Sequence, residues 1–547
     1  MLLIECSKIK KYYCDRLILD IDNLKIYSED RIGIVGANGV GKTTLMSILS
    51  KRLEPDEGWV KLYGSYSYIT QMEEPRGRRI SEELASKFGV ESTWRVNMSG
   101  GEKTRFKLAE ALGNDSVILF ADEPTSNVDM EGIQLMEERF HEYKGGLIVI
   151  AHDRGFLDKL CNKILEIENG KIKIYQGNYS HFRDQKMKER ERAEIEYDAY
   201  MKEKRRLEEV INHTKQKVKN IRKAPIRMGN SEARLHKMGN QKAKVNREKA
   251  VKNVEKRIEH LESKDKPKKE ERIKLGIMDT DRIHSKIIIE GKNLNKTFGN
   301  KIIFNDAEFN IYNGYKIALI GSNGCGKSTL IKMIMENDEG IKVAQGAKIG
   351  YFSQDMDILD EKESIIENIM ESSIYPENFA RLLLARLLFK GEAVYKKIAV
   401  LSGGERVKVS FAKILLQDIN LLVLDEPTNF IDINVLEVIE EELKDYDRTL
   451  LFVSHDRSFV DAVASHIMTI ENHKIKVFPG NYKAYLTSKE KFIHINETEL
   501  EKRIFILKNR LSEVVGRLSM PSKTDDIVAL DKEYHEILGE IEKLKER

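Results

Sequence analysis

Cysteine is scarce in this 547-residue sequence, and it has no long apolar run. None of the 4 cysteines, Cys6, Cys14, Cys161 and Cys325, lies in a CxxC pair. This argues against a zinc site or a disulfide framework and fits a reducing compartment. No apolar run approaches the roughly 18 residues that a membrane span needs, and the N-terminus lacks an apolar signal core. We therefore expect a cytoplasmic protein with no membrane segment.

Acidic residues are sparse in one stretch of the chain. The whole chain has a net charge of +3, with 33% charged and 41% hydrophobic residues. Residues 181–270 carry 28 basic and 16 acidic residues, and residues 211–250 carry 12 basic and only 2 acidic ones. A basic segment is thus inserted into an otherwise mildly acidic chain. Such a segment attracts phosphate backbones, although charge alone is equally typical of a solvated helical face.

The sequence repeats itself. "IGIVGANGVGKTTLMSIL" from Ile32 matches "IALIGSNGCGKSTLIKMI" from Ile317, at an offset of 285. "MSGGEKTRFKLAEAL" from Met98 matches "LSGGERVKVSFAKIL" from Leu401, at an offset of 303, and later segments keep this offset. Each copy alternates apolar strands with glycine-rich loops and helices, which is typical of an α/β domain. We predict two homologous modules, over 1–180 and 286–487.

Two glycine-rich loops fit the pattern G-x4-G-K-[ST], each after an apolar strand. Glycines let the loop turn its N–H groups toward phosphate oxygens, and the following helix N-terminus adds partial positive charge. Lys42 and Lys327 would reach the β- and γ-phosphates, and Thr43 and Ser328 would hold Mg²⁺. The predicted phosphate-binding residues are Gly36, Asn38, Gly39, Gly41, Lys42, Thr43 and Thr44, and then Gly321, Asn323, Gly324, Gly326, Lys327, Ser328 and Thr329.

A pair of acidic residues ends a later apolar strand in each module. "VILFADEPTSNVD" contains Asp122 and Glu123, and "LLVLDEPTNFID" contains Asp425 and Glu426. The apolar runs indicate core strands of a parallel sheet. The first acid of each pair would contact Mg²⁺, and the second would polarise the attacking water as a general base.

At these motifs both modules resemble ABC ATPases, in which two modules clamp two ATP molecules head to tail. The resemblance implies ATP hydrolysis at two sites, with His152 and His455 as catalytic switch histidines beside Glu123 and Glu426. It implies that each signature serine acts at the opposite P-loop. Gln71 and Gln354 match the Q-loops, which also contact the metal ion. The remaining nucleotide-binding residues that it implies are Tyr13 and Phe298 at the adenine, the signature residues Ser99, Gly100, Gly101, Glu102, Ser402, Gly403, Gly404 and Glu405, and the D-loop residues Asp129 and Asp432.

Glycine and proline are absent from 181 to 224, where strong helix formers dominate. A helix of about 40 residues would span roughly 60 Å, and a second of about 30 residues returns after a break near 222–231. We predict an antiparallel helical hairpin within a linker over 181–285. A further coiled hairpin over 488–547 follows from apolar residues spaced by three and four. The predicted fold is therefore α/β, with two tandem P-loop ABC ATPase domains joined by a long α-helical hairpin.

The linker resembles that of the ABC-F family, and "RKAPIRMGNSEARLHKMG" from Arg222 is similar to the tip of its antibiotic-resistance branch. The resemblance implies binding to the 70S ribosome at its E site, with contacts to 23S rRNA and P-site tRNA. The tip would then lie near the peptidyl-transferase centre and displace pleuromutilins, lincosamides and streptogramin A. The resemblance also implies that the protein acts as a monomer with an intramolecular ATP sandwich, and that Mg²⁺ accompanies ATP.

The tip combines cations with apolar side chains. Cations would neutralise RNA phosphates, whereas the apolar residues either touch RNA, tRNA or the drug site, or simply pack the two helices together. The residues expected to act here are Lys215, Lys217, Lys219, Arg222, Lys223, Ile226, Arg227, Met228 and Arg234.

Two other functions stay open on the sequence. The first is a general ABC-F translation factor that relieves stalled ribosomes without a drug; only the tip sequence argues against it. The second is an ATPase subunit of a separate permease, which the basic hairpin and the two fused modules disfavour. The first module has 28 residues from Gln71 to Ser99, against 48 from Gln354 to Ser402 in the second. The shorter spacing leaves no room for the additional helical arm of some housekeeping ABC-F factors.

Overall fold

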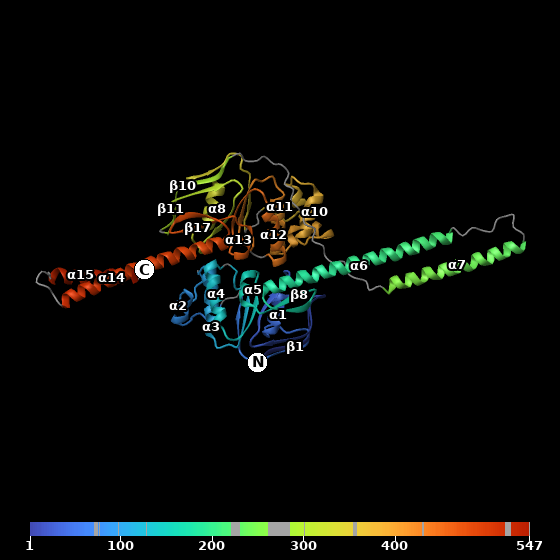
Figure 1. Ribbon diagram of the computed structural model, residues 1–547, viewed down its shortest axis with the longest axis horizontal. Helices are drawn as coiled ribbons and strands as arrows, with labels where there is room; N and C mark the ends of the chain where they lie inside the picture. Colours follow the sequence, from blue (N-terminus) through green and yellow to red (C-terminus); the bar gives the residue numbers. More distant parts are fainter. Residues whose placement is uncertain are drawn as a thin grey trace.

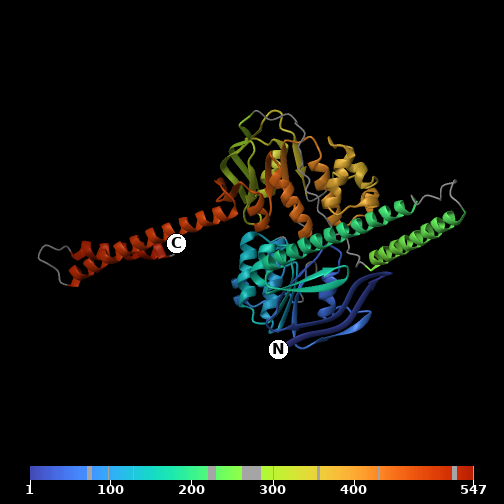
Figure 2. The ribbon, with the colours of Figure 1, turned by 45° about the vertical axis from the view of Figure 1, so that its right-hand side comes forward.

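Two α/β cassettes lie against each other, and a helical hairpin leaves the pair on each side (Figure 1). The two hairpins point in opposite directions in both ribbon views (Figure 2). The structure, a computed structural model, describes residues 1–70, 75, 77–96, 98–126, 128–219, 230–260, 285–299, 301–353, 358–428, 431–519 and 527–545. Within these ranges no helix combines the length and the hydropathy that crossing a membrane requires.

The first cassette contains a six-stranded sheet, in the order β5-β6-β7-β3-β8-β9, and a three-stranded antiparallel sheet, in the order β2-β1-β4. Its strands are β1 (Leu2–Tyr13), β2 (Arg16–Tyr27), β3 (Arg31–Val35), β4 (Glu57–Leu62), β5 (Tyr66–Ile69), β6 (Ile118–Asp122), β7 (Gly146–Ile150), β8 (Lys163–Glu168) and β9 (Lys171–Gln176). Its helices are α1 (Lys42–Leu49), α2 (Glu82–Phe88), α3 (Gly100–Gly113), α4 (Met130–Glu142) and α5 (Arg154–Leu160).

The second cassette repeats this arrangement with sheet orders β14-β15-β16-β12-β17-β18 and β11-β10-β13. Its strands are β10 (Ile287–Phe298), β11 (Lys301–Tyr312), β12 (Lys316–Ile320), β13 (Ile341–Val343), β14 (Ile349–Phe352), β15 (Leu421–Asp425), β16 (Thr449–Val453), β17 (His466–Glu471) and β18 (Lys474–Pro479). Its helices are α8 (Lys327–Glu336), α9 (Ile365–Met370), α10 (Glu377–Arg386), α11 (Gly403–Leu415), α12 (Ile433–Asp445) and α13 (Arg457–Val463), with the 3₁₀ turns η1 (Gly391–Tyr395) and η2 (Ile398–Val400). The short helices α9 and α10 lie in the longer segment between the Q-loop and the signature.

The core strands are buried on both faces, as their unbroken apolar runs predict. In β6 all five residues are buried. Ile118 and Phe120 face the cluster that contains α1, whereas Leu119 and Ala121 face the cluster that contains α4 and α5. Because successive side chains in a strand point to opposite faces, one apolar run serves two cores. The strand therefore holds Asp122 and Glu123 rigidly at its carboxyl end.

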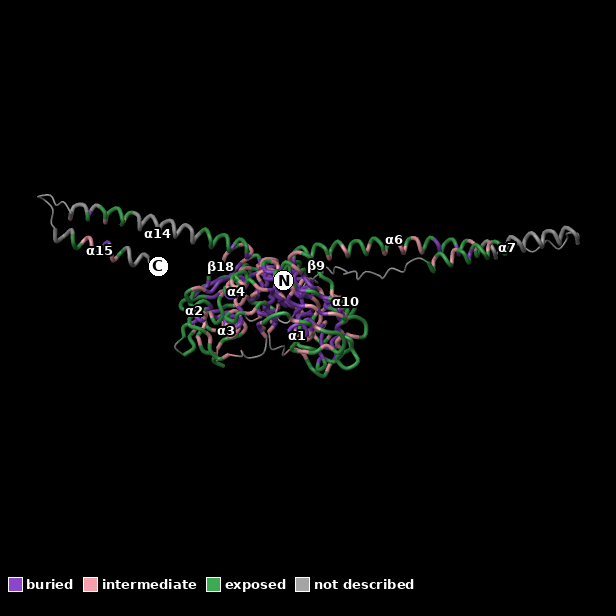
Figure 3. The backbone as a smooth tube through the Cα atoms, turned by 90° about the horizontal axis from the view of Figure 1, so that it is seen from below, coloured by how far each residue is buried: buried purple, intermediate pink, exposed green. Residues whose placement is uncertain are grey.

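The linker hairpin consists of α6 (Tyr179–Lys219) and α7 (Asn230–Glu259). Most of the residues whose burial is described along these helices are exposed (Figure 3). Leu207 and Ile211 on α6 and Val251 on α7 form a narrow buried seam. Lys215 Nζ lies 3.0 Å from Glu255 Oε1 across the pair. A helix of 41 residues reaches about 60 Å, so the far end of the hairpin lies well away from both cassettes.

The C-terminal hairpin consists of α14 (Tyr482–Ser519) and α15 (Ile527–Lys545). Val514 and Ile537 are buried in its seam, and other apolar residues pack against them at the predicted spacing: Leu507, Leu511, Leu518 and Tyr534. This pattern is the one that a two-helix coiled arrangement requires. From Glu497 onward the chain has 10 basic and 12 acidic residues, so the two hairpins differ clearly in charge.

Candidate nucleotide-binding and catalytic sites

The two P-loops join the central strands β3 and β12 to the helices α1 and α8. Gly41 and Gly326 precede these helices with φ of 103° and 115°, a conformation that favours glycine. A Cβ atom on Gly41 would lie 2.7 Å from Ile18 Cγ2, and one on Gly326 would clash with Ile303. Only glycine therefore allows the loop to pack this closely while its N–H groups face a phosphate.

Each P-loop lysine is held by its own loop. Lys42 Nζ donates to the carbonyl oxygens of Gly36 (2.8 Å) and Ala37 (3.2 Å). Lys327 Nζ donates to those of Gly321 (2.9 Å) and Ser322 (3.1 Å). Both lysines are buried. A cation held inside a ring of backbone groups is well placed to exchange these carbonyls for phosphate oxygens.

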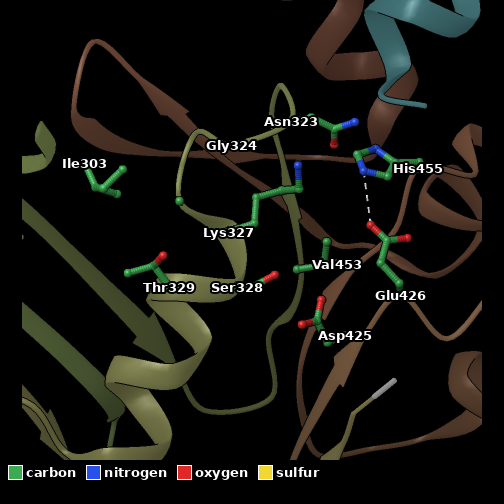
Figure 4. A pocket seen from close by; sticks show the side chains of 11 residues that line it. Ile303, Asn323, Gly324, Lys327, Ser328, Thr329, Asp425, Glu426, Val453 and His455 are labelled. Carbon is green, nitrogen blue, oxygen red and sulfur yellow. Dashed lines mark ion pairs between the residues drawn. The ribbon is translucent and has the colours of Figure 1, made fainter. Parts of the chain in front are cut away.

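A cavity of about 300 Å³ opens at the second P-loop (Figure 4). Figure 4 shows Lys327 and Ser328 on one side of it, with Asp425, Glu426 and His455 on the other. The residues that line it are Ile303, Asn323, Gly324, Gly326, Lys327, Ser328, Thr329, Asp425, Glu426, Val453 and His455. Apart from Ile303 and Val453, all were predicted from sequence motifs. Ser99, which the family resemblance implies at this site, does not belong to this lining.

The first acidic residue of each pair faces the P-loop hydroxyl. Burial raises the pKa of Asp122 to about 6, partly offset by a hydrogen bond from Thr43. Burial likewise raises the pKa of Asp425, with a hydrogen bond from Ser328 opposing it. A buried carboxylate beside a hydroxyl fits a Mg²⁺ that keeps several water ligands and also binds substrate phosphates. Over the described ranges no group of three His, Cys, Asp or Glu side chains is arranged to hold a metal ion.

The second acidic residue of each pair has a strained backbone. Glu123 has a φ of 48° and Glu426 a φ of 51°, which non-glycine residues rarely adopt. Their N–H groups donate to the carbonyl oxygens of Ile150 (2.8 Å) and Val453 (3.0 Å) on the neighbouring strand. Such strain costs about 1–3 kcal/mol per residue and is concentrated at functional sites. The two carboxylates are thus aimed by the sheet, as a general base requires.

Each of these glutamates meets a switch histidine. His152 Nε2 lies 3.3 Å from Glu123 Oε1, and His455 Nε2 lies 3.1 Å from Glu426 Oε1. The histidines follow β7 and β16, the strands next to those that carry the glutamates. In this position a histidine would orient the glutamate and respond to charge at the γ-phosphate, the role that the family resemblance implies.

The two glutamates differ in their protonation. Burial raises the pKa of Glu426 to about 7, and burial with the nearby Lys327 lowers the pKa of His455 to about 4. Burial also tends to raise the pKa of Glu123. However, His152, Lys42 and Ser126 together outweigh burial and lower this pKa below its usual value. Ser126 Oγ donates to Glu123 Oε2 at 3.2 Å. The first site therefore keeps its carboxylate ionised more readily than the second.

The signature serines start helices. Ser99 begins α3 and Ser402 begins α11, each as the N-cap of a capping box. The Glu102 carboxylate accepts from the Ser99 N–H (2.8 Å), and Glu405 does the same for Ser402 (2.9 Å). The glutamates thus fix the helix starts, where the unpaired N–H groups and the helix dipole favour an anion. Gly100, Gly101, Gly403 and Gly404 form the first turns of these helices.

The D-loop aspartates connect the cassettes. Asp129 of the first cassette accepts a hydrogen bond of 2.9 Å from the backbone N–H of Asn323, in the second P-loop. Asp432 of the second cassette likewise approaches Lys42, in the first P-loop. Burial lowers the pKa of Lys42, and the negative charge of Asp432 opposes that shift. Each P-loop is therefore approached by the D-loop of the other cassette, as a head-to-tail pair of ATPase modules requires.

Comparison with known proteins agrees with this geometry. A family profile described as ABC transporter matches residues 19–83 and 304–429, and a second with the same description matches 165–243. The chain is 33% identical to the erythromycin resistance ATP-binding protein MsrA of Staphylococcus epidermidis, across 84% of this chain and 96% of that protein. The chain belongs to the ABC-F family of ATPases. The chain is therefore an ATPase, as its motifs predict.

Other relatives of this ABC-F ATPase are named for ribosome protection and for the control of translation. The ribosome protection protein VmlR of Bacillus subtilis is 29% identical over 97% of this chain and 96% of its own length. The energy-dependent translational throttle protein EttA of Haemophilus influenzae is 31% identical over 72% of this chain and 67% of its own. A crystal structure of an archaeal ribosome recycling factor with a ribosomal stalk protein has a TM-score of 0.56 at 19% identity, covering 88% of this chain and 92% of that one. That last likeness shows the tandem-cassette fold.

The remaining predicted residues of the ABC-F ATPase are exposed at strand ends, lie on the linker helices, or fall outside the described residues. Tyr13 and Phe298 end β1 and β10 and are more than half exposed, at 52% and 57%, so their rings are open to stacking. Lys217 and Lys219 lie on α6, and Arg234 lies on α7. Outside the described residues are Gln71, Gln354, Arg222, Lys223, Ile226, Arg227 and Met228.

The sequence did not single out the residues that join the cassettes. Ile433 of α12 packs into the core of the first cassette, and Met130 of α4 packs against that of the second. Arg154 and Arg457 each bind a glutamate across the interface. The available signal was the repeated "HDR" at His152 and His455, in which the arginine recurs at the same offset as the histidine.

Proposed function

We propose that this ABC-F ATPase is a ribosomal protection factor. It binds the 70S ribosome at the E site and directs the tip of the α6–α7 hairpin past the P-site tRNA toward the peptidyl-transferase centre. There it displaces a bound antibiotic, by direct overlap or by moving tRNA and 23S rRNA. ATP hydrolysis with Mg²⁺ then releases the factor.

The basic hairpin that leaves the cassette pair carries this proposal. Its length of about 60 Å is enough to reach from a surface site into a large particle. Residues 211–250 hold 12 basic and 2 acidic residues, which favours a polyphosphate partner. The names of two relatives, an erythromycin resistance protein and a ribosome protection protein, support the same function.

The chemistry of the cycle follows from the two sites. Mg²⁺ held by Thr43 with Asp122, and by Ser328 with Asp425, would neutralise charge on the β- and γ-phosphates. Glu123 and Glu426 take a proton from the attacking water. While both ATP molecules are intact the cassettes stay closed, which fixes the direction of the hairpin. After hydrolysis the cassettes separate, and the hairpin leaves the ribosome.

A drug-protection assay tests this proposal. Purified protein is added to a bacterial translation reaction that a pleuromutilin, a lincosamide or a streptogramin A has stopped. We expect synthesis to recover with the native protein and to stay inhibited with an Ile226→Ala, Met228→Ala variant that still hydrolyses ATP. Recovery that is equal for both proteins would contradict a role of the tip.

A translation factor that acts without a drug is the second candidate, because a relative is named as a translational throttle. It predicts that the protein changes the translation rate of drug-free ribosomes and leaves the inhibited reaction unchanged. The same assay without a drug therefore separates the two functions.

A further inference from the structure

Two arginine–glutamate pairs cross the interface between the cassettes at duplicated positions. Arg154 at the start of α5 binds Glu440 on α12 through Nη1 and Nη2 of its guanidinium, with Nη1 donating to Oε2 at 3.2 Å. Arg457 at the start of α13 binds Glu137 on α4 in the same way, again with an Nη1–Oε2 distance of 3.2 Å. The carboxylates are almost fully buried. A buried bidentate pair fixes both distance and orientation. The second pair belongs to a larger group of charges, because Lys159 Nζ lies 2.8 Å from Glu137 and Arg457 Nη2 lies 3.9 Å from Asp153.

Each pair joins two parts of one ATP site. Arg154 comes two residues after His152, the switch histidine of the first site. Its partner helix α12 is capped at its N-terminus by Asp432, the D-loop residue whose charge acts on Lys42 of that same site. The Arg154–Glu440 pair therefore holds the switch loop of the first site against the helix that the second cassette contributes to it. Arg457 and Glu137 join the corresponding parts of the second site.

The first pair has an additional member that links it to the hairpin. Glu437 lies one turn before Glu440 on α12, 3.9 Å from Arg154 Nη1 and 3.5 Å from Arg183 Nε. Arg183 lies in the second turn of α6, at the root of the linker hairpin. Tyr179, which starts α6, is buried in this group, and burial with the Glu437 charge raises its pKa.

The corresponding positions in the other half of the chain lack the two charged residues of the Glu437–Arg183 contact. At the offset of 303, Glu437 corresponds to Gln134 and Arg183 corresponds to Leu486 at the root of the C-terminal hairpin. Glutamine and leucine cannot form an ion pair. The chain therefore contains a natural control for the contact between α12 and the linker hairpin.

We propose that Arg154 and Glu440 are positioning residues of the first ATP site, and that Glu437 transmits the position of α12 to the linker hairpin through Arg183. As α12 moves with the opening and closing of the cassettes, the root of α6 follows it. Among the described side chains, no ion pair joins α4 to the root of the C-terminal hairpin, although Met130 packs against the cluster that contains Tyr482 and Tyr485. This inference rests on the ATPase activity and needs no particular target of the hairpin.

Single-site ATPase measurements test the positioning role. In a Glu426→Gln background only the first site retains its base. There we expect Arg154→Gln to lower kcat about tenfold or more with little change in KM, because a small misplacement of reacting groups is costly. Arg457→Gln in the same background should lower kcat clearly less, by about threefold or less, because Arg457 binds Glu137 and only approaches Asp153, beside His152, at 3.9 Å. In a Glu123→Gln background the order reverses.

A charge swap keeps the test informative if Arg154→Gln folds poorly. We expect Arg154→Glu with Glu440→Arg to recover most of the lost kcat, which general destabilisation would not allow. Equal losses from Arg154→Gln and Arg457→Gln in both backgrounds would overturn the inference, because the pairs would then only hold the cassettes together.

Distance measurements by electron spin resonance test the tie to the hairpin. Cys14 and Cys325 are replaced by serine, and labels are placed on Val210→Cys and Ile302→Cys, two exposed positions on α6 and β11. We expect Glu437→Gln to broaden the distance distribution and Gln134→Glu to leave it unchanged. An unchanged distribution in the Glu437→Gln protein would show that the Arg183 contact is an incidental surface pair.

Discussion

The two halves of this chain repeat one design, a cassette followed by a helical hairpin, and they differ in what surrounds the predicted catalytic residues. Glu123 and Glu426 share a strained backbone and a histidine partner. However, a serine donates to Glu123, whereas Glu426 is more deeply buried and its pKa is raised to about 7. The hairpins diverge too, since the first is strongly basic and the second is nearly balanced. The two halves therefore share their motif residues, whereas the surroundings of the glutamates and the charge of the hairpins differ.

Removing the two bases should have the largest effect. We expect Glu123→Gln with Glu426→Gln to lower ATP turnover by about 10²–10⁴-fold, the usual contribution of a general base. Each single variant should keep the turnover of its intact site. Steady-state phosphate release measures this. If one single variant already abolishes all turnover, the two sites do not hydrolyse independently.

Reversing charge on the linker hairpin should come next. We expect Lys217→Glu with Lys219→Glu to weaken ribosome binding by tens of fold at physiological salt and to lower the salt-dependence slope by about 2, because each lysine would neutralise one phosphate. Lys508→Glu with Lys532→Glu on the C-terminal hairpin is the matched control, with a much smaller expected effect. Equal losses would mean that only total charge matters.

The two sites should also respond differently to pH. A general base acts only when ionised, and the pKa of Glu426 is about 7 in the free protein. In a Glu123→Gln background we therefore expect kcat/KM to rise roughly tenfold from about pH 6 to about pH 8. In a Glu426→Gln background it should stay nearly flat, since the pKa of Glu123 is lowered. Identical profiles would contradict the electrostatic difference between the sites.

The smallest effect should come from the residues before the switch histidines, Ala151 and Ser454. Ser454 Oγ accepts from the Asp456 N–H and lies 3.1 Å from Thr428 Oγ1. Ser454→Ala removes both hydrogen bonds, so we expect it to destabilise the second cassette by about 1 kcal/mol. Ala151→Ser should be close to neutral. Thermal unfolding of both variants checks this, and a larger loss from Ala151→Ser would contradict it.

The features that the sequence could predict are those defined by short motifs or by local composition. The P-loops, the acidic strand ends and the switch histidines are defined by short motifs, and the structure gathers Lys327, Asp425, Glu426 and His455 around one cavity. The hairpins follow from helix-forming composition and apolar spacing, because neither property depends on distant parts of the chain.

Residues whose role depends on tertiary packing could not be predicted. Arg154 meets Glu440 only after two cassettes have folded and docked, and a spacing of 286 residues carries no local signal. Likewise Glu123 and Glu426 lie in nearly identical motifs, so their different pKa values come from burial and neighbours. The capping roles of Glu102 and Glu405 are different, because the local pattern S-x-x-E already indicates them, although on the sequence both residues are assigned only to the signature motif.

Sedimentation of the hydrolysis-deficient protein tests the central claim most directly. A lysate with the Glu123→Gln, Glu426→Gln protein is run on a sucrose gradient with ATP, beside the native protein and the same variant without ATP. We predict that the variant sediments with 70S ribosomes only when ATP is present, because both sites stay closed. A variant that remains at the top of the gradient, or pellets with membranes, would contradict a ribosomal function driven by this ATPase.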